Sequence, residues 1–158
     1  MAQKVILVAS NDLQSLYVAN NVCSAVEYFR KLGGNVGVAG LVINKDDGSG
    51  EAAAFAETVK IPILASIPQD DDLRKKSANY HIVGTKESQW GELFAELGTN
   101  TAEAPPLRPK PLDQDGLLNL FAASETGADF VLQPATDADM RGKFAKPKES
   151  LEVVYDEV

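Results

Sequence analysis

Hydrophobic positions in the first part of the chain alternate between two patterns. Residues 4–9, 36–43 and 61–67 are short, apolar and rich in β-branched side chains, which is typical of strands buried on both faces of a parallel sheet. Between the first two runs, apolar residues recur at helical spacing; they are Leu16, Ala19, Val22, Cys23, Val26 and Phe29. Strands and helices that alternate in this way predict right-handed crossovers and an α/β fold with a parallel sheet.

Polar residues and glycines mark where the predicted helices begin and end. The first helix follows the capping side chains of residues 10–12 and stops at the glycine pair 33–34. The second spans about residues 51–59, and the third begins with three carboxylates at residues 70–72, which the helix dipole favours. A fourth helix is predicted over residues 88–97. The side chains that it is expected to place in the core are Trp90, Leu93, Phe94 and Leu97.

A sheet of only three parallel strands has an open edge. Parallel sheets are normally covered on both faces, and an uncovered edge of a strand of this buried type invites pairing with another chain. The pattern therefore predicts either that this domain associates or that further strands belong to its sheet.

The distribution of proline divides the chain into three parts. Pro62 and Pro68 lie in the first part, and the other six of the eight prolines follow it. We therefore expect an α/β domain over residues 1–98, a proline-rich linker over residues 99–112, and a short helix with an extended acidic tail over residues 113–158.

The net charge excludes some classes of partner. The 158 residues include 15 Lys and Arg and 23 Asp and Glu, which gives a formal net charge of −8. Nucleic acids and anionic membranes require a basic face, so neither is an expected partner. The longest apolar run, residues 36–43, is far shorter than the ~20 residues that span a bilayer. No membrane insertion is expected, and a reducing cytoplasm is the expected compartment.

The single cysteine and the single histidine argue against a self-sufficient catalytic or metal site. Cys23 cannot form an intramolecular disulfide, and one thiol per chain cannot hold a zinc ion or an iron–sulfur cluster. Its place on the apolar helix face predicts a packing residue. His81 has no nucleophile motif near it. We expect no catalytic residue and no metal ligand in this chain.

Polar segments follow all three predicted strands. In an open α/β sheet, ligands bind outside the carboxyl ends of the strands. Residues 10–12, 44–47 and 68–70 occupy those ends. Asn44 could present its amide to the edge of a base, and Lys45 its ammonium to a phosphate. The same residues are typical of helix caps and turns, and spacing alone does not decide between the two interpretations.

The turn after the second strand is not a phosphate-binding loop. Neither GxxxxGK followed by Ser or Thr, nor GxGxxG, occurs anywhere in the chain. Asp46 and Asp47 would repel a phosphate at this turn. The acidic run at residues 70–72 is interpreted as a solvated helix cap rather than a metal site. The basic run at residues 74–76 is typical of a solvated helix face, with a docking surface for an acidic partner as the alternative.

Several segments together resemble the second half of nitrogenase-type iron proteins. The three shared signatures are the strand-to-helix segment of residues 10–21, Gly-Leu-Val-Ile-Asn-Lys at residues 40–45, and Ile-Pro-Gln-Asp at residues 67–70. Four further motifs resemble the X-subunit branch of that family, the iron proteins of chlorophyllide a reductase; they are VINKDDGSGEA at 42–52, RKKSANYHIVG at 74–84, PPLRPKPL at 105–112 and LEVVYDEV at 151–158. The resemblance covers essentially the whole chain.

The resemblance implies a partial doubly wound parallel sheet, the C-terminal half of a P-loop NTPase-type iron-protein fold. It also implies that one set of residues surrounds the adenine end of ATP; these are Asn44, Lys45, Pro68, Gln69, Asp70 and Leu73. Gln69 stands where nitrogenase relatives commonly carry an arginine, so a cation contact is not implied there. Asp12 and Gln14 fall in a segment that approaches nucleotide across the dimer in those relatives.

The resemblance also implies cofactors and partners for a longer parent protein. That parent would be an oxidoreductase component of bacteriochlorophyll biosynthesis. It would be a homodimer that binds ATP with Mg²⁺, holds a 4Fe–4S cluster between its subunits, and passes electrons to the catalytic Y and Z subunits. The phosphate loop, the Mg²⁺ ligands and the cluster cysteines of the family are absent from this sequence. We therefore expect the chain to correspond to the C-terminal half of such a protein and to be inactive alone.

Two other interpretations remain open at this point. The chain could belong to a partition-type or MinD-like ATPase, which shares the fold but has no cluster. It could also be a non-enzymatic α/β module that recruits a partner through its exposed sheet edge. For the chain alone, we expect neither ATP hydrolysis nor a bound cluster, and we expect self-association.

Overall fold

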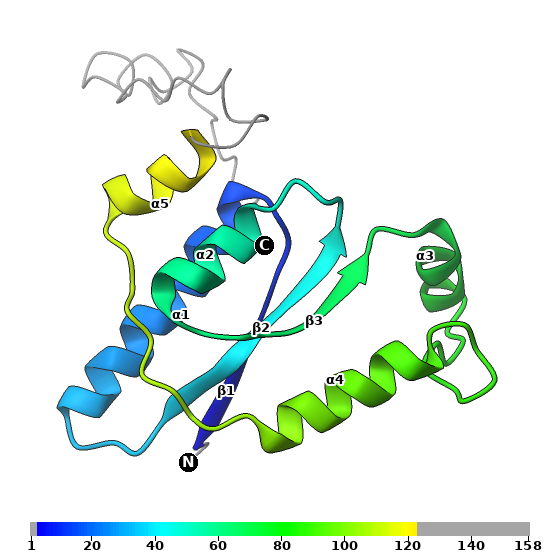
Figure 1. The fold of residues 1–158 in the computed structure, drawn as a ribbon, viewed down its shortest axis with the longest axis horizontal. Coiled ribbons are helices and arrows are strands. Elements are labelled where there is room, and N and C mark those ends of the chain that lie inside the picture. The colour runs from blue at the N-terminus through cyan, green and yellow to red at the C-terminus, as the bar shows by residue number, and fades with distance from the viewer. Residues whose placement is uncertain (1–2, 123–158) are drawn as a thin grey trace, which may run out of the picture.

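The computed structural model describes residues 3–122, which form an α/β fold (Figure 1). The elements in chain order are β1 (Lys4–Ala9), α1 (Leu13–Lys31), β2 (Gly37–Asp46), α2 (Glu51–Val59), β3 (Ile63–Pro68), α3 (Asp71–Ala78), α4 (Gly91–Glu103) and α5 (Gln114–Ala122). The three strands form one parallel sheet in the order β1-β2-β3. The predicted α/β class and parallel sheet are confirmed. Most of the predicted tail, residues 123–158, lies outside the described residues.

Burial separates the central strand from the two outer ones. In β2, seven consecutive residues from Gly37 are buried, as predicted. In β1, however, burial alternates, and the side chains of Ile6 and Val8 are 40% and 63% exposed. In β3, Ile63 is 44% exposed. The expectation that all three strands are buried on both faces was therefore wrong for β1 and β3. In β1, Leu7 and Ala9 belong to the larger core cluster, whereas the smaller cluster on the other face contains no β1 residue.

Two hydrophobic clusters lie on opposite faces of the sheet. The larger one joins Leu7 and Leu41 of the sheet to α1, α2 and Leu117 of α5. The smaller one contains Ala39, Val42 and Leu64, with Leu97 of α4 packed against them. Figure 1 shows the same division, with α1, α2 and α5 on one side of the sheet and α4 on the other. Within the described residues, no helix is both long and apolar enough to cross a membrane.

The first helix begins and packs largely as predicted. The Asp12 carboxylate caps it by accepting a hydrogen bond from the Ser15 amide at 2.8 Å. The buried stripe consists of Leu16, Ala19, Asn20, Cys23 and Val26. Phe29 is 50% exposed, so its predicted place on this stripe was wrong. At 3.6 residues per turn, Phe29 lies about 140° around the helix from Leu16, which points it past the sheet.

The fourth helix differs from its prediction in position and burial. It begins at Gly91 rather than residue 88 and continues to Glu103. None of its residues is buried, and Trp90, which precedes it, is only half-buried. The expected core role was therefore wrong for Trp90, Leu93 and Phe94, whereas Leu97, although only half-buried, packs against the smaller core cluster. Its contacts with the sheet are mainly to β3 at the sheet edge, so only part of its apolar side is covered.

The proline-rich segment packs across the fold in an extended conformation. Leu107 forms an isolated antiparallel bridge with Val38 at the beginning of β2. This close approach requires glycine at position 37, because a Cβ there would lie 2.5 Å from the Pro106 carbonyl carbon. Further along, the buried amide of Asn20 donates to the Leu112 carbonyl and accepts from the Leu112 amide, both at 2.8 Å. These contacts carry the chain to α5, whose Leu117 enters the larger core cluster.

Candidate nucleotide-binding cleft

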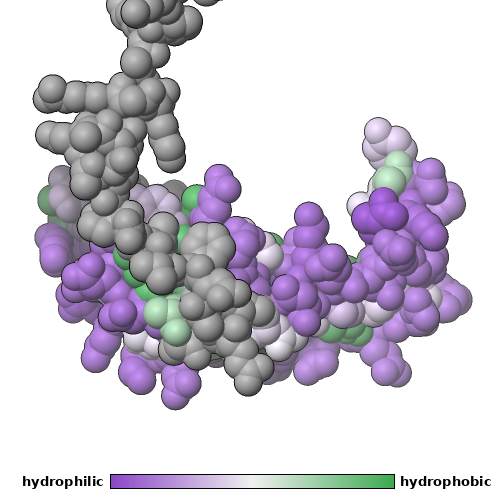
Figure 2. Space-filling view, turned by 90° about the horizontal axis from the view of Figure 1, so that it is seen from above, coloured by the Kyte–Doolittle hydropathy of each residue, from purple (hydrophilic) through white to green (hydrophobic). Residues whose placement is uncertain are grey.

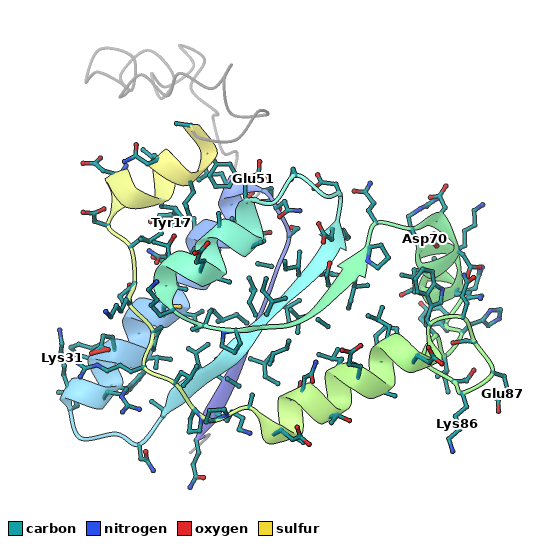
Figure 3. All side chains as sticks on the ribbon, viewed as in Figure 1. Tyr17, Lys31, Glu51, Asp70, Lys86 and Glu87 are labelled. Carbon is teal, nitrogen blue, oxygen red and sulfur yellow. The ribbon has the colours of Figure 1, made fainter. Side chains whose placement is uncertain are left out.

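An open cleft of about 910 Å³ lies at the carboxyl ends of β2 and β3. The structure brings all the residues of the predicted adenine site together there; they are Asn44, Lys45, Pro68, Gln69, Asp70 and Leu73. Figure 2 shows the surface of this side as mainly hydrophilic, with the part that carries α3 and the following loop projecting beyond the rest. Figure 3 labels Asp70 at the beginning of α3, and Lys86 and Glu87 point outward from that loop.

The wall that β2 provides contains an irregularity in strand pairing. Asn44 pairs with Ile67 and Asp46 with Pro68, so the register shifts across Lys45. Lys45 adopts a left-handed backbone conformation with φ 54°, a region that non-glycine residues rarely occupy. Beyond this bulge, the Asp46 carbonyl accepts a hydrogen bond from the Gln69 amide at 2.9 Å. Asn44 is half-buried, whereas the Lys45 side chain is exposed. The two side chains therefore meet the cleft in different solvent environments.

The opposite wall is the turn from β3 into α3. The Asp70 carboxylate caps α3 by accepting from the amides of Asp72 at 2.7 Å and Leu73 at 3.1 Å. Asp72 in turn forms an ion pair with Lys76 at 2.7 Å. The interpretation of residues 70–72 as a helix cap is confirmed. The cap fixes the turn on which Pro68 and Gln69 face the cleft.

Seven further residues line the cleft beyond the six that were predicted for it. They are Ile67, Asp71, Arg74, Ser77, Ala78, Val83 and Phe94. A signal for two of them was present, because Ser77 and Ala78 lie one helical turn after Leu73 and Arg74 on α3. Val83 and Phe94 come from the loop after α3 and from α4, and only the tertiary structure brings them here. With Leu73 they give the cleft an apolar wall of the kind that covers a flat aromatic ring.

Two carboxylates, Asp46 and Asp47, lie on the turn that follows Lys45, beside the β2 wall of the cleft. Hydrogen bonds from the Ser66 hydroxyl and the Gly48 amide lower the pKa of Asp46, and those from the Ser49 hydroxyl and amide lower the pKa of Asp47. Both side chains are therefore carboxylates at neutral pH. Two negative charges directly after Lys45 disfavour a phosphate on that turn. The amide and the apolar wall are better suited to a base than to a phosphate chain.

Of the remaining candidate residues, Asp12, Gln14 and His81 are not among those that line the cleft, whereas Arg74 of the basic run is. Asp12 and Gln14 are at the N-terminus of α1; the Ser10 hydroxyl and the Ser15 amide lower the pKa of Asp12. His81 is exposed on the loop after α3. In the basic run, Arg74 pairs with Asp71 at 3.1 Å on an exposed helix face. That pairing fits the interpretation as a solvated face.

Cys23 does not fit the ligation of an iron–sulfur cluster. It is fully buried on α1, as predicted for a packing residue, and this burial raises the pKa of its thiol to about 11. A 4Fe–4S cluster binds four thiolates, and this chain has one cysteine. Among the described residues, no group of three or more His, Cys, Asp or Glu side chains could hold a metal ion. The residues of this chain therefore do not form a cluster site.

Comparison with known proteins identifies relatives over nearly the whole chain. The chain is 74% identical over 157 residues to the chlorophyllide reductase 35.5 kDa chain of Cereibacter sphaeroides, and the match covers 99% of this chain and 47% of that protein. It is 68% identical to the chain of the same name from Rhodobacter capsulatus, covering 100% of this chain and 47% of that protein. The chain thus spans about half the length of these curated relatives.

More distant similarity points the same way. The chain is 24% identical over 91 residues to the light-independent protochlorophyllide reductase iron-sulfur ATP-binding protein of Heliobacterium modesticaldum, covering 58% of this chain and 31% of that protein. The family described as 4Fe-4S iron sulfur cluster binding proteins, NifH/frxC family, matches residues 1–126. This match and the parallel α/β fold agree with the resemblance to nitrogenase-type iron proteins. The chain belongs to the NifH/frxC family of 4Fe–4S cluster binding proteins.

Proposed function

We propose that this chain forms the adenine-binding part of the ATP-dependent iron protein of chlorophyllide a reductase, an oxidoreductase of bacteriochlorophyll biosynthesis. One observation carries the proposal: Asn44 and the Pro68–Asp70 turn meet in one cleft, in a chain 74% identical to a chlorophyllide reductase chain. A distant relative is named as an ATP-binding iron–sulfur protein. The family match favours this function over that of a MinD-like ATPase.

In this proposal, the cleft recognises the base rather than the phosphates. The half-buried Asn44 amide offers a donor and an acceptor to the edge of an adenine. Pro68 and Leu73 contribute to the apolar walls beside the ring. Gln69 contributes an amide and no charge to the second wall. Lys45, at the exposed rim of the cleft, lies where its ammonium would meet the ribose or phosphate side of the nucleotide.

Catalysis belongs to the longer protein in this proposal. Phosphoryl transfer requires a phosphate-binding loop, a Mg²⁺ ligand and a group that positions the attacking water. The chain has no phosphate-loop motif, and its residues do not fit a cluster. The longer protein would supply the Mg²⁺ and cluster ligands, act in the cytoplasm as a homodimer, and transfer electrons to the Y and Z subunits. The 158-residue chain alone is proposed to be inactive.

Nucleotide titrations of the 158-residue chain test the adenine site. We expect calorimetry to show that ATP, ADP and AMP bind more tightly than GTP, since the cleft recognises the base. Asn44→Ala should weaken AMP binding about tenfold, the effect of one well-formed hydrogen bond. The control is Asn35→Ala, an exposed asparagine before β2 and outside the cleft. Equal affinity for adenine and guanine nucleotides, or an Asn44→Ala affinity equal to that of Asn35→Ala, would contradict the proposal.

A further inference from the structure

A single side chain, Asn11, joins the loops that follow β1 and β2. Its amide nitrogen donates to Asp46 Oδ1 at 2.9 Å and to Asp47 Oδ1 at 2.8 Å. Its amide oxygen accepts from the Ala52 amide at 2.9 Å, in the first turn of α2. Asn11 is only 8% exposed, and all of these polar atoms have partners. One neutral amide therefore bridges two carboxylates that would otherwise repel each other.

Asp46 connects this bridge to β3. Its other carboxylate oxygen accepts a hydrogen bond from the Ser66 hydroxyl, and its Oδ1 also accepts from the Gly48 amide at 3.0 Å. Its main-chain carbonyl accepts from the Gln69 amide at 2.9 Å. Asp46 thus holds together the ends of β2 and β3, from which the two walls of the cleft extend. Asn11 is the contact that ties this assembly to the loop after β1.

The residue that this network holds in place is Lys45. Its left-handed backbone lies at the bulge between Asn44 and Asp46. A non-glycine residue remains in that region only when surrounding contacts enforce it, and here those contacts converge on Asp46. Without Asn11, the repulsion between Asp46 and Asp47 would act directly on the bulge.

We infer that Asn11 is a positioning residue for the nucleotide cleft: it fixes Asp46, and through Asp46 the bulge that directs Asn44 and Lys45 into the cleft. Asn11 itself is not among the residues that line the cleft. This inference rests on the proposed adenine site for its functional consequence, but its structural part is independent of any nucleotide.

The test compares two buried asparagines. Asn20 is 7% exposed and, like Asn11, both donates and accepts through its amide, but it holds the proline-rich segment at Leu112. We expect Asn11→Ala to weaken AMP binding about tenfold and to accelerate hydrogen exchange of the Gly48 and Gln69 amides. Asn20→Ala should lower the stability of the chain to a similar extent and leave both readouts unchanged. Comparing these two variants distinguishes a specific effect on the cleft from a general loss of stability.

A milder variant keeps the test decisive if Asn11→Ala does not fold. Ser66 is exposed, and Ser66→Ala removes a different bond to Asp46. It should accelerate exchange at Gly48 and Gln69 and weaken AMP binding several-fold. If AMP binds to the unmodified chain but neither variant changes its affinity by more than twofold, the inference is overturned. If no nucleotide binds at all, the proposed adenine site fails, and the exchange rates alone decide: unchanged rates at Gly48 and Gln69 overturn the positioning role.

Discussion

At the scale of single residues, the chemistry of this fold depends on how short polar side chains are partnered. The capping role of Asp70 and the packing role of Cys23 could be predicted because helix dipoles and apolar stripes are local properties. The bridge from Asn11 to Asp46 could not, because it joins residues 35 positions apart. Asn11 follows a strand and precedes a helix, so the sequence alone makes it look like an ordinary cap.

The carboxylate of Asp46 makes the stability of the chain sensitive to acid. Its pKa in the folded chain is lowered from 3.8 by the Ser66 hydroxyl first and then by the Gly48 amide, against the opposing effects of burial and, to a smaller extent, of Asp47. A lowered folded pKa contributes stability above the unfolded value, and that contribution is lost as the pH falls through the folded pKa. We predict that urea unfolding shows a loss of stability below about pH 4. The loss should be shallower in Asp46→Asn.

The control for the acid prediction is Asp115→Asn, an exposed carboxylate on α5. It should leave the dependence on pH close to that of the unmodified chain. If the slopes of stability against pH are the same for Asp46→Asn and for the unmodified chain between pH 2.5 and 5, the hydrogen bonds to Asp46 do not stabilise the fold.

The backbone of Lys45 provides a second test at this scale. Glycine occupies the left-handed region without steric cost, so Lys45→Gly should stabilise the unliganded chain by up to about 1 kcal/mol. The same change removes the ammonium that is proposed to meet the phosphates. ATP should therefore bind several-fold more weakly, whereas adenosine binding stays unchanged in calorimetry.

Lys60 offers a matched control for that substitution. It also has a left-handed backbone, φ 63°, but it caps the C-terminus of α2 away from the cleft. Lys60→Gly should give the same gain in stability and no change in ATP affinity. An equal ATP affinity for both variants would exclude a phosphate contact by Lys45.

At the scale of elements, the proline-rich segment acts as part of the packing of the larger core. Asn20 is its anchor on α1, through two hydrogen bonds to Leu112. We predict that Asn20→Ala destabilises the chain by about 1–3 kcal/mol, because both polar groups of Leu112 lose their buried partner. Denaturant unfolding measures the loss, and limited proteolysis should show faster cleavage within residues 104–113.

The neighbouring asparagine distinguishes this anchor from a general effect on the helix. Asn21 is exposed on α1, and Asn21→Ala should change stability by no more than about 0.5 kcal/mol. Equal destabilisation by the two substitutions would mean that the Leu112 contact does not hold the segment.

The helices and strands show which features of the fold are determined by local sequence and which depend on tertiary packing. Strand and helix order followed from hydrophobic periodicity, and residues 37–43 of β2 are all buried, as the unbroken apolar run predicted. The similar apolar run in β1 also predicted burial on both faces, but Val8 of this strand is exposed. Burial depends on neighbouring layers and not on the strand. For the same reason the cleft wall from Val83 and Phe94 could not be anticipated from sequence spacing.

At the scale of the whole molecule, β1 carries exposed apolar side chains. Ile6 and Val8 are 40% and 63% exposed, on the face of the strand opposite to Leu7 and Ala9 of the larger core cluster. Among the described residues, β1 pairs with β2 alone, which leaves its other edge open. Soluble proteins rarely leave an apolar strand at an open edge, because its backbone groups can pair with another chain.

We therefore predict that the isolated chain self-associates through this edge. Sedimentation velocity at increasing concentration should show species larger than the monomer. Val8→Lys should shift the distribution toward monomer, because a charge on an exposed edge strand opposes pairing. The control is Ile82→Lys on the loop after α3, where the residue is 80% exposed but belongs to no strand. If Ile82→Lys disperses the chain and Val8→Lys does not, association runs through the projecting loop. A clean monomer for the unmodified chain at high concentration would mean that its open edge is protected by some other feature of the chain.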